Sequence, residues 1–420
     1  MSKFKIIGGT PLKGEISVSG NKNAALPIIA ATVLTDEPCT LHNVPRILDV
    51  MSMVAILEDL GKTVVFESNT LKVSGSITHA VPSQELVRKI RASILYLGAL
   101  LGRCRKGTIA PPGGCVIGKR GLDIHSDVFT GMGVKLNFST TTYEAVLPDE
   151  QDSYLFLQEA SVTATENALL LAATVSKETI IDNAACEPHV SDLANILVKM
   201  GAKIKGIGTN RLKIKGTKKL KGVTHQVVAD NIEAGTFMIA ALCTKGDITI
   251  KNIVKEHLIT PTFYMNLMGA KPEFIDNTTV RVRYERPLKA PSRKVQVGLW
   301  PGFPTDLMSP MVVLTTQAEG NTLCHDWMFE SRMFFCDKLV GMGANITICD
   351  PHRVIVNGIT QLKAQHLSSP DLRAGIALVI AAMMADGESV IDNAELIDRG
   401  YENIDERLRN LGAKIERVSS

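Results

Sequence analysis

The chain has 420 residues, of which 45% are hydrophobic and 21% are charged, and its formal net charge is +3. This length allows two or three domains with sizeable cores, and the composition is that of a soluble globular protein. The small net charge argues against nucleic acid or an acidic membrane as a partner, so any anion binding must be local.

The N-terminus and the cysteines indicate where the protein works. The opening MSKFKIIGGT has no apolar signal core, and the longest strongly apolar run, 374–385, is too short to span a bilayer. Eight scattered cysteines do not form a small disulfide scaffold, so we expect reduced thiols and a cytoplasmic protein without membrane insertion. No C-x-x-C or H-x-x-x-H pair occurs, so we expect no metal site.

A six-fold repeat organises the chain. An apolar residue and a glycine close a helical pattern in LGKTVVF, MGVKLNF, MGAKIKG, MGAKPEF, MGANITI and LGAKIER. The six glycines, 68 to 74 residues apart, are Gly61, Gly133, Gly201, Gly269, Gly343 and Gly412. Such constant spacing indicates repeated structural units.

Each unit has the same predicted elements. An apolar helix comes first, then a short strand, then an amphipathic helix such as 49–61, whose glycine is a natural C-cap. Two short strands follow, except that the last unit keeps only one. We expect the apolar helices at 21–34, 90–102, 161–175, 230–243, 305–318 and 371–384. We expect the short strands at 39–44, 108–110, 178–184, 247–253, 321–327 and 388–394.

Six such units are too many for one core, and three per domain suits the usual domain size. We therefore predict two similar α/β domains, 21–229 and 230–420, with the strand-like residues 1–20 joining the second. The chain would cross twice between them, which suits a hinge and an active-site cleft between the domains.

The apolar helices open on polar residues: Lys22 and Asn23, Arg91, Ser161, Asp230, Asp306, and Asp371 with Arg373. As N-caps, Ser161 and Asp230 are ordinary. Cations at a helix N-terminus oppose the helix dipole, so Lys22, Arg91 and Arg373 favour a bound anion close to them. This pattern predicts an anion-binding site.

The stretch PPGGCVIGKR, 111–120, nearly matches a phosphate-binding P-loop. A P-loop needs Ser or Thr after the lysine, where this chain has Arg120, and the two prolines break any strand leading into it. The nearby Lys119 and Arg120 favour a reactive thiolate at Cys115. A simple turn with an inert thiol is the alternative.

The motifs SGNKNAALPI, PPGGCVIGKRGLDIH, FPTDLMSP, FESRM, DLRAG and IDRGYENI, in this order, resemble the UDP-N-acetylglucosamine 1-carboxyvinyltransferase family of enolpyruvyl transferases. The resemblance spans the whole chain. It implies two inverse α/β barrels of three repeats each. It also implies transfer of the enolpyruvyl group of phosphoenolpyruvate to the 3′-hydroxyl of UDP-N-acetylglucosamine, with release of phosphate, in the first committed step of peptidoglycan synthesis. No metal, organic cofactor or obligate protein partner is implied.

The resemblance also implies roles for individual residues. Cys115 would be the general acid, Asp306 the base for the sugar hydroxyl, and Lys22 and Arg399 catalytic cations. Phosphoenolpyruvate would bind Lys22, Asn23, Arg120 and Arg399. The UDP-sugar would bind Asn23, Arg91, Arg120, Gly121, Leu122, Asp123, Ser161, Val162, Thr163, Asp306 and Met328. Supporting residues would be Asp230, Arg332, Asp371 and Arg373.

Three positions depart from the family pattern. Gly121 replaces a proline, Thr163 replaces a glycine, and Glu159 stands where some members have lysine. The resemblance implies that all three lie on the UDP-sugar side, so another nucleotide acceptor is one alternative. Shikimate 3-phosphate as acceptor and an inactive UDP-sugar-binding protein are the others, although the cysteine loop argues against the first and the intact set of catalytic residues against the second.

Overall fold

The computed structural model describes residues 2–113 and 121–419. The chain has a mixed α/β fold and divides into two compact units. The first unit comprises the described residues of 20–228, and the second comprises 2–19 and 229–419. Each boundary lies one residue before the position expected from the repeats.

The first unit contains seven helices among its described residues: α1 (Lys22–Ala31), α2 (Leu48–Asp59), α3 (Gln84–Arg88), α4 (Leu95–Cys104), α5 (Asp123–Gly131), α6 (Val162–Ala172) and α7 (Pro188–Met200). Its 3₁₀ turns are η1 (Thr32–Leu34) and η2 (Arg91–Ile94). Its strands are β3 (Cys39–His42), β4 (Thr63–Glu67), β5 (Thr70–Ser74), β6 (Lys106–Ile109), β7 (Lys135–Phe138), β8 (Tyr143–Val146), β9 (Ser153–Phe156), β10 (Glu178–Asp182), β11 (Lys203–Lys205), β12 (Arg211–Lys215) and β13 (Thr224–Gln226).

The helices of the second unit are α8 (Asn231–Cys243), α9 (Ile259–Leu267), α10 (Met308–Thr315), α11 (Cys336–Gly341), α12 (Leu372–Met384) and α13 (Ile404–Asn410). Its 3₁₀ turns are η3 (Lys255–Leu258), η4 (Thr305–Leu307) and η5 (Ala394–Leu396). Its strands are β1 (Ser2–Ile7), β2 (Lys13–Ser17), β14 (Asp247–Lys251), β15 (Glu273–Asp276), β16 (Thr279–Arg283), β17 (Leu288–Lys289), β18 (Val295–Gln296), β19 (Ala318–His325), β20 (Ile346–Asp350), β21 (Arg353–Gly358), β22 (His366–Ser368), β23 (Glu388–Asp392) and β24 (Lys414–Ser419).

The apolar helices form the interior of each unit. Helices α8, α10 and α12 pack against one another, as α4 does against α1 and α6. Every residue of α8 and α10 is buried, because neither helix has a polar face to turn toward water. Two of these helices begin later than expected: η2 precedes α4, and η4 precedes α10.

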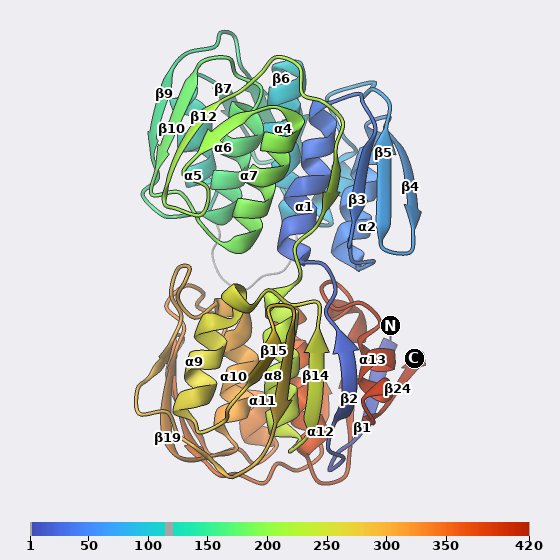
Figure 1. The fold of residues 1–420 in the computed structure, drawn as a ribbon, viewed down its shortest axis with the longest axis vertical. Helices are drawn as coiled ribbons and strands as arrows, with labels where there is room; N and C mark the ends of the chain where they lie inside the picture. Colours follow the sequence, from blue (N-terminus) through green and yellow to red (C-terminus); the bar gives the residue numbers. More distant parts are fainter. Residues whose placement is uncertain (1, 114–120, 420) are drawn as a thin grey trace. The chain divides into compact units, whose positions relative to one another are not determined.

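The strands among the described residues form six sheets around these helices, three in each unit. In the first unit their strand orders are β13-β3-β5-β4, β6-β8-β7 and β11-β12-β10-β9, and in the second β15-β16-β14-β2, β17-β19-β21-β20 and β22-β23-β1-β24. The strands β1 and β2 both pair within the second unit. Figure 1 shows the two chain ends beside each other there, where β1 pairs antiparallel with β24.

The repeated glycines end helices, as the sequence predicts. All six lie at or directly after a helix C-cap and have positive φ, from 84° at Gly133 to 120° at Gly201. This left-handed conformation suits glycine because a Cβ would be strained there. Each glycine therefore turns the chain from its amphipathic helix into the next strand.

Candidate functional site

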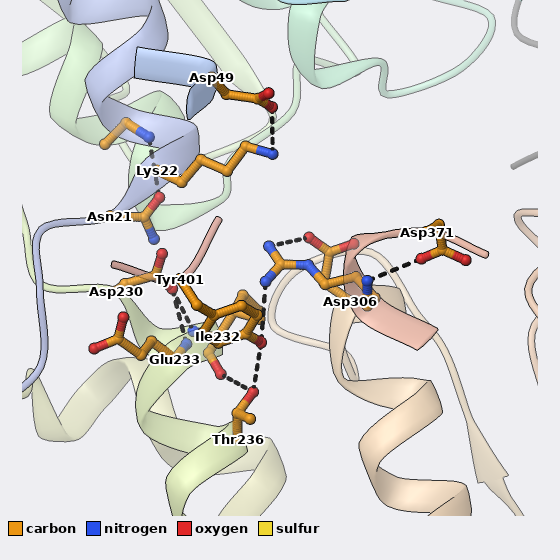
Figure 2. A network of polar contacts seen from close by, with 12 residues as sticks. Asn21, Lys22, Asp49, Asp230, Ile232, Glu233, Thr236, Asp306, Asp371 and Tyr401 are labelled. Atoms are coloured by element: carbon orange, nitrogen blue, oxygen red, sulfur yellow. Dashed lines mark hydrogen bonds and ion pairs between the residues drawn. The ribbon is translucent and has the colours of Figure 1, made fainter. Parts of the chain in front are cut away.

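Lys22 is the first residue of α1, directly after the N-cap residue Asn21, whose side chain accepts a hydrogen bond from Ala24. Its Nζ lies 2.7 Å from Oδ2 of Asp49, in the first turn of α2, and both side chains are largely buried. Figure 2 shows this pair. A carboxylate of the protein therefore already stabilises a cation that opposes the dipole of α1.

Arg91 reaches the segment that follows the cysteine loop. It lies in η2, and its Nη2 donates a 3.0 Å hydrogen bond to the carbonyl oxygen of Gly121. A Cβ on Gly121 would come within 2.5 Å of Oδ2 of Asp123, the first residue of α5. Glycine at this position therefore lets the Asp123 carboxylate approach the backbone closely, whereas a proline ring would occupy that space.

The start of α6 carries three of the expected UDP-sugar contacts. Ser161 is the N-cap residue, but its side chain makes no capping hydrogen bond, whereas a serine in this position usually does. The Thr163 hydroxyl lies 3.1 Å from Nε2 of the buried His125, and Nδ1 of that ring lies 3.0 Å from Nδ2 of Asn167. The side chain of Thr163 thus contacts an interior polar network, which a glycine could not do.

Asp306, the expected base, lies in η4 and is held by two arginines. Its Oδ1 is 3.2 Å from Nη2 of Arg332, and its Oδ2 is 2.8 Å from Nη2 of Arg373. The arginine side chains are only 2% and 5% exposed, whereas that of Asp306 is 25% exposed. The carboxylate is therefore fixed from the interior by two cations and remains open to solvent on one side.

The charge of Arg373 is strongly favoured. Burial alone would lower its pKa, but the negative charge of Asp306, together with Tyr401 and Asp230, outweighs burial and raises the pKa well above its usual range. Arg373 is therefore a permanent cation beside Asp306.

Asp230 and Asp371 act as helix caps. Oδ1 of Asp230 accepts hydrogen bonds from the backbone of Ile232 and Glu233 at the start of α8. Oδ1 of Asp371 does the same for α12 and also lies 4.0 Å from Nη1 of Arg332. These contacts account for both aspartates as supports of the helices that open at the site.

Asp326 joins two segments of the candidate site. Fully buried, it accepts hydrogen bonds from the Thr305 hydroxyl, beside Asp306, and from the backbone N–H of Met328. Burial raises the pKa of Asp326, although these hydrogen bonds and the charge of Arg332 partly offset the effect. Asp326 thus links Thr305, the residue before Asp306, to the backbone at Met328.

Three of the remaining expected residues are half-buried, and two are not described by the structure. Arg399 is half-buried between η5 and α13 in the second unit, and Asn23 and Leu122 are half-buried in the first. Cys115 and Arg120 lie outside the described residues.

Sequence reasoning missed several residues that hold the expected ones. Asp49, Asp326, His125 and Tyr401 were not among the expected site residues. Two signals were available: Asp326 lies within the expected strand 321–327, and Tyr401 lies within the motif IDRGYENI. A polar side chain that becomes buried is expected to have a hydrogen-bond partner.

Two features are absent from the described part of the chain. Over residues 2–113 and 121–419, no group of three or more His, Cys, Asp or Glu side chains could hold a metal ion. None of the helices described is long and apolar enough to cross a membrane.

Comparison with known proteins places the chain in a family. The sequence model of EPSP synthase (3-phosphoshikimate 1-carboxyvinyltransferase) matches residues 6–408. The solved structure of the enolpyruvyl transferase NikO from Streptomyces tendae superimposes with a TM-score of 0.87, covering 100% of this chain and 99% of that one, at 22% identity. The chain therefore belongs to the enolpyruvyl transferase family.

Two full-length relatives carry the same name. The UDP-N-acetylglucosamine 1-carboxyvinyltransferase of Treponema denticola is 45% identical over 432 residues, with 99% of both chains covered. The protein of the same name from Borreliella burgdorferi is 46% identical over 429 residues, with both chains covered completely.

Proposed function

We propose that this chain is a UDP-N-acetylglucosamine 1-carboxyvinyltransferase, which transfers the enolpyruvyl group of phosphoenolpyruvate to the 3′-hydroxyl of UDP-N-acetylglucosamine. The products are the enolpyruvyl ether and inorganic phosphate. The first reason is the full-length similarity to relatives of that name at 45–46% identity. The second is the chemistry of the side chains around Asp306.

The first step is an addition. The sugar oxygen attacks C2 of phosphoenolpyruvate, Asp306 accepts the hydroxyl proton, and Cys115 donates a proton to the C3 methylene. The two electrons of the C2–C3 double bond form the new C3–H bond, giving a tetrahedral intermediate that still carries the phosphate. Lys22, Arg120 and Arg399 bind the phosphate and carboxylate, for which fixed cations are suited.

The second step is an elimination. The thiolate that Cys115 became in the first step takes a proton from C3, the C2–C3 double bond re-forms, and the C2–O bond to phosphate breaks with its electrons going to phosphate. Protein groups that bind phosphate stabilise this leaving group. No electron is gained or lost overall, so the reaction needs no redox cofactor.

The observation that carries the proposal is the carboxylate of Asp306 between Arg332 and Arg373. Two guanidinium groups keep a neighbouring carboxylate ionised and orient its oxygens. An ionised, one-quarter exposed carboxylate in a fixed position is suited to accept a proton from a bound hydroxyl.

We also propose the finer architecture that the resemblance implies, in which each unit is an inverse α/β barrel of three repeats. The three sheets around apolar helices in each unit, and the helix-ending glycine in each repeat, support it. A cytoplasmic location follows from the proposed reaction, because phosphoenolpyruvate and UDP-sugars are metabolites of the cytoplasm.

The test is phosphate release with a panel of acceptors. We expect stoichiometric phosphate from phosphoenolpyruvate with UDP-N-acetylglucosamine, and none with shikimate 3-phosphate or without acceptor. If phosphate is released only when shikimate 3-phosphate is the acceptor, the chain has the 3-phosphoshikimate 1-carboxyvinyltransferase activity that the matching family model names. No release with any acceptor, combined with UDP-sugar binding by calorimetry, would show a binding protein.

A further inference from the structure

A directed chain of hydrogen bonds lies behind the proposed base. Nη1 of Arg373, the arginine that contacts Asp306, donates to the hydroxyl oxygen of Tyr401 at 3.2 Å. That oxygen lies 2.9 Å from Oγ1 of Thr236, which in turn donates to the carbonyl oxygen of Ile232 at 2.8 Å. Figure 2 shows Asp306, Tyr401 and Thr236 within this network.

The hydrogen positions in this chain follow from its two ends. A guanidinium can only donate, so Arg373 makes the Tyr401 oxygen an acceptor. The carbonyl of Ile232 can only accept, so it takes the single hydroxyl hydrogen of Thr236. Oγ1 of Thr236 therefore accepts the hydrogen of Tyr401, and each hydroxyl has a defined orientation.

The side chains that form this chain of hydrogen bonds are shielded from water. Tyr401, Thr236 and Arg373 are 1%, 2% and 4% exposed, so no solvent molecule can replace a missing partner easily. Burial raises the pKa of Tyr401, although Arg373 partly offsets the effect, so the phenol keeps its proton at neutral pH. The guanidinium also lies 5.6 Å above the centre of the Tyr401 ring, a distance at which a cation and an aromatic face attract.

We propose that Tyr401 is a positioning residue for the reaction: with Thr236 it fixes the guanidinium of Arg373 and, through it, the orientation of the Asp306 carboxylate. Tyr401 touches neither substrate in this role. The inference rests on the proposed function, because it concerns the residue to which that proposal assigns the hydroxyl proton. The orientation of the Asp306 carboxylate on η4 would thus depend on Thr236, on α8, and on Tyr401, in the segment before α13.

Two conservative variants remove the proposed contacts without changing shape. Tyr401→Phe deletes the hydroxyl that Arg373 and Thr236 share, and Thr236→Val deletes the acceptor for Tyr401. The first unit contains another fully buried tyrosine that serves as a matched control: the hydroxyl of Tyr96, on α4, donates to the carbonyl oxygen of Met53 at 2.6 Å. Tyr96→Phe therefore loses a buried hydroxyl of the same kind in the unit that does not contain Asp306.

The readout is phosphate release, with kcat and KM measured separately. Because a small displacement of a catalytic group lowers the rate of the chemical step more than substrate affinity, we expect Tyr401→Phe to lower kcat about tenfold. Its KM for UDP-N-acetylglucosamine should stay within about twofold of the wild-type value. We expect Thr236→Val to lower kcat in the same direction, about threefold, and Tyr96→Phe to leave it unchanged.

A double variant separates positioning from general destabilisation. If Tyr401 acts through Asp306, then Tyr401→Phe should cause no further loss of kcat when added to Asp306→Asn. An equal tenfold loss in both backgrounds would overturn the inference, as would a Tyr401→Phe enzyme with the kcat of Tyr96→Phe. If Tyr401→Phe does not fold, an unchanged kcat of Thr236→Val would overturn it in the same way.

The assignment of Asp306 as the base and the positioning role of Tyr401 are contradicted by different results. Full turnover of Asp306→Asn would remove the assignment of the base and the positioning role together. A large loss in Asp306→Asn with no loss in Tyr401→Phe and Thr236→Val would leave the base in place and remove only the positioning role.

Discussion

Replacing Asp306 by asparagine tests the base most directly, because the side chain keeps its shape and loses its charge and basicity. The change leaves Arg332 near Asp326 and Asp371, at 3.9 and 4.0 Å, whereas Arg373 keeps the Tyr401 hydroxyl as a neutral partner. Breaking a fully buried ion pair costs about 3–5 kcal/mol. Since a quarter of the Asp306 side chain is exposed, we expect a loss of about 2 kcal/mol in the free energy of unfolding.

That loss cannot explain the predicted loss of activity. A protein with at least about 5 kcal/mol of stability would remain more than about 99% folded. Removing a general base lowers turnover by about 100- to 10,000-fold, which corresponds to about 2.7–5.5 kcal/mol of activation free energy. The predicted rate loss therefore reflects chemistry and not unfolding.

Phosphate release and calorimetric binding of UDP-N-acetylglucosamine check this prediction together. We expect kcat to fall by at least about 100-fold while the Kd changes by less than about tenfold. Asp247→Asn is the matched control, because Asp247 makes a two-bond ion pair with Arg281 and its side chain is 32% exposed. Turnover of Asp306→Asn equal to that of Asp247→Asn would place the base elsewhere.

Three further predictions follow from other features. Burial raises the pKa of six of the seven described cysteines and leaves the exposed Cys349 as the only described competitor for a thiol reagent. The epoxide fosfomycin should therefore label Cys115 first, as peptide mapping would show. Cys115→Asp should keep turnover, whereas Cys115→Ser should lose most of it. Gly121→Ala should displace the Asp123 carboxylate and raise the KM for the UDP-sugar several-fold without changing kcat, and an unchanged KM would contradict a role for this segment in nucleotide binding. Burial raises the pKa of Glu166 well above 4.5, so the folded state binds its proton more tightly than the unfolded state does. The free energy of unfolding of the wild type relative to that of Glu166→Gln should therefore fall as the pH rises above 4.5. Denaturant melts in which this difference in free energy is the same at pH 4 and pH 7 would refute the prediction.

Much of the local structure follows from the sequence. The apolar runs predict the six interior helices, and the repeated glycines predict where the amphipathic helices end, because helix periodicity and positive φ are local properties. Asp230 and Asp371 were recognisable at helix starts, and both accept the expected backbone hydrogen bonds. Helix starts were less predictable, since η4 carries Asp306 in a 3₁₀ turn ahead of α10.

The partners of the site residues could not be predicted in this way. The Lys22–Asp49 pair joins α1 to α2, and Tyr401 meets Arg373 from a segment 28 residues further along the chain. Such contacts depend on how helices pack, which spacing does not determine. The cations at helix starts favoured a bound anion, yet carboxylates of the protein lie beside Lys22 and Arg373, so the pattern has a second, internal origin.

The reaction itself is tested most directly by the mass of its product made in heavy water. Addition followed by elimination makes C3 a methyl group in the intermediate, so a solvent deuteron enters at C3 and either it or an original hydrogen leaves. We predict a product with the mass of UDP-N-acetylglucosamine plus phosphoenolpyruvate minus phosphoric acid, with deuterium in its vinyl methylene. An unchanged UDP-sugar after complete incubation, or an enolpyruvyl product without deuterium at C3, would contradict it.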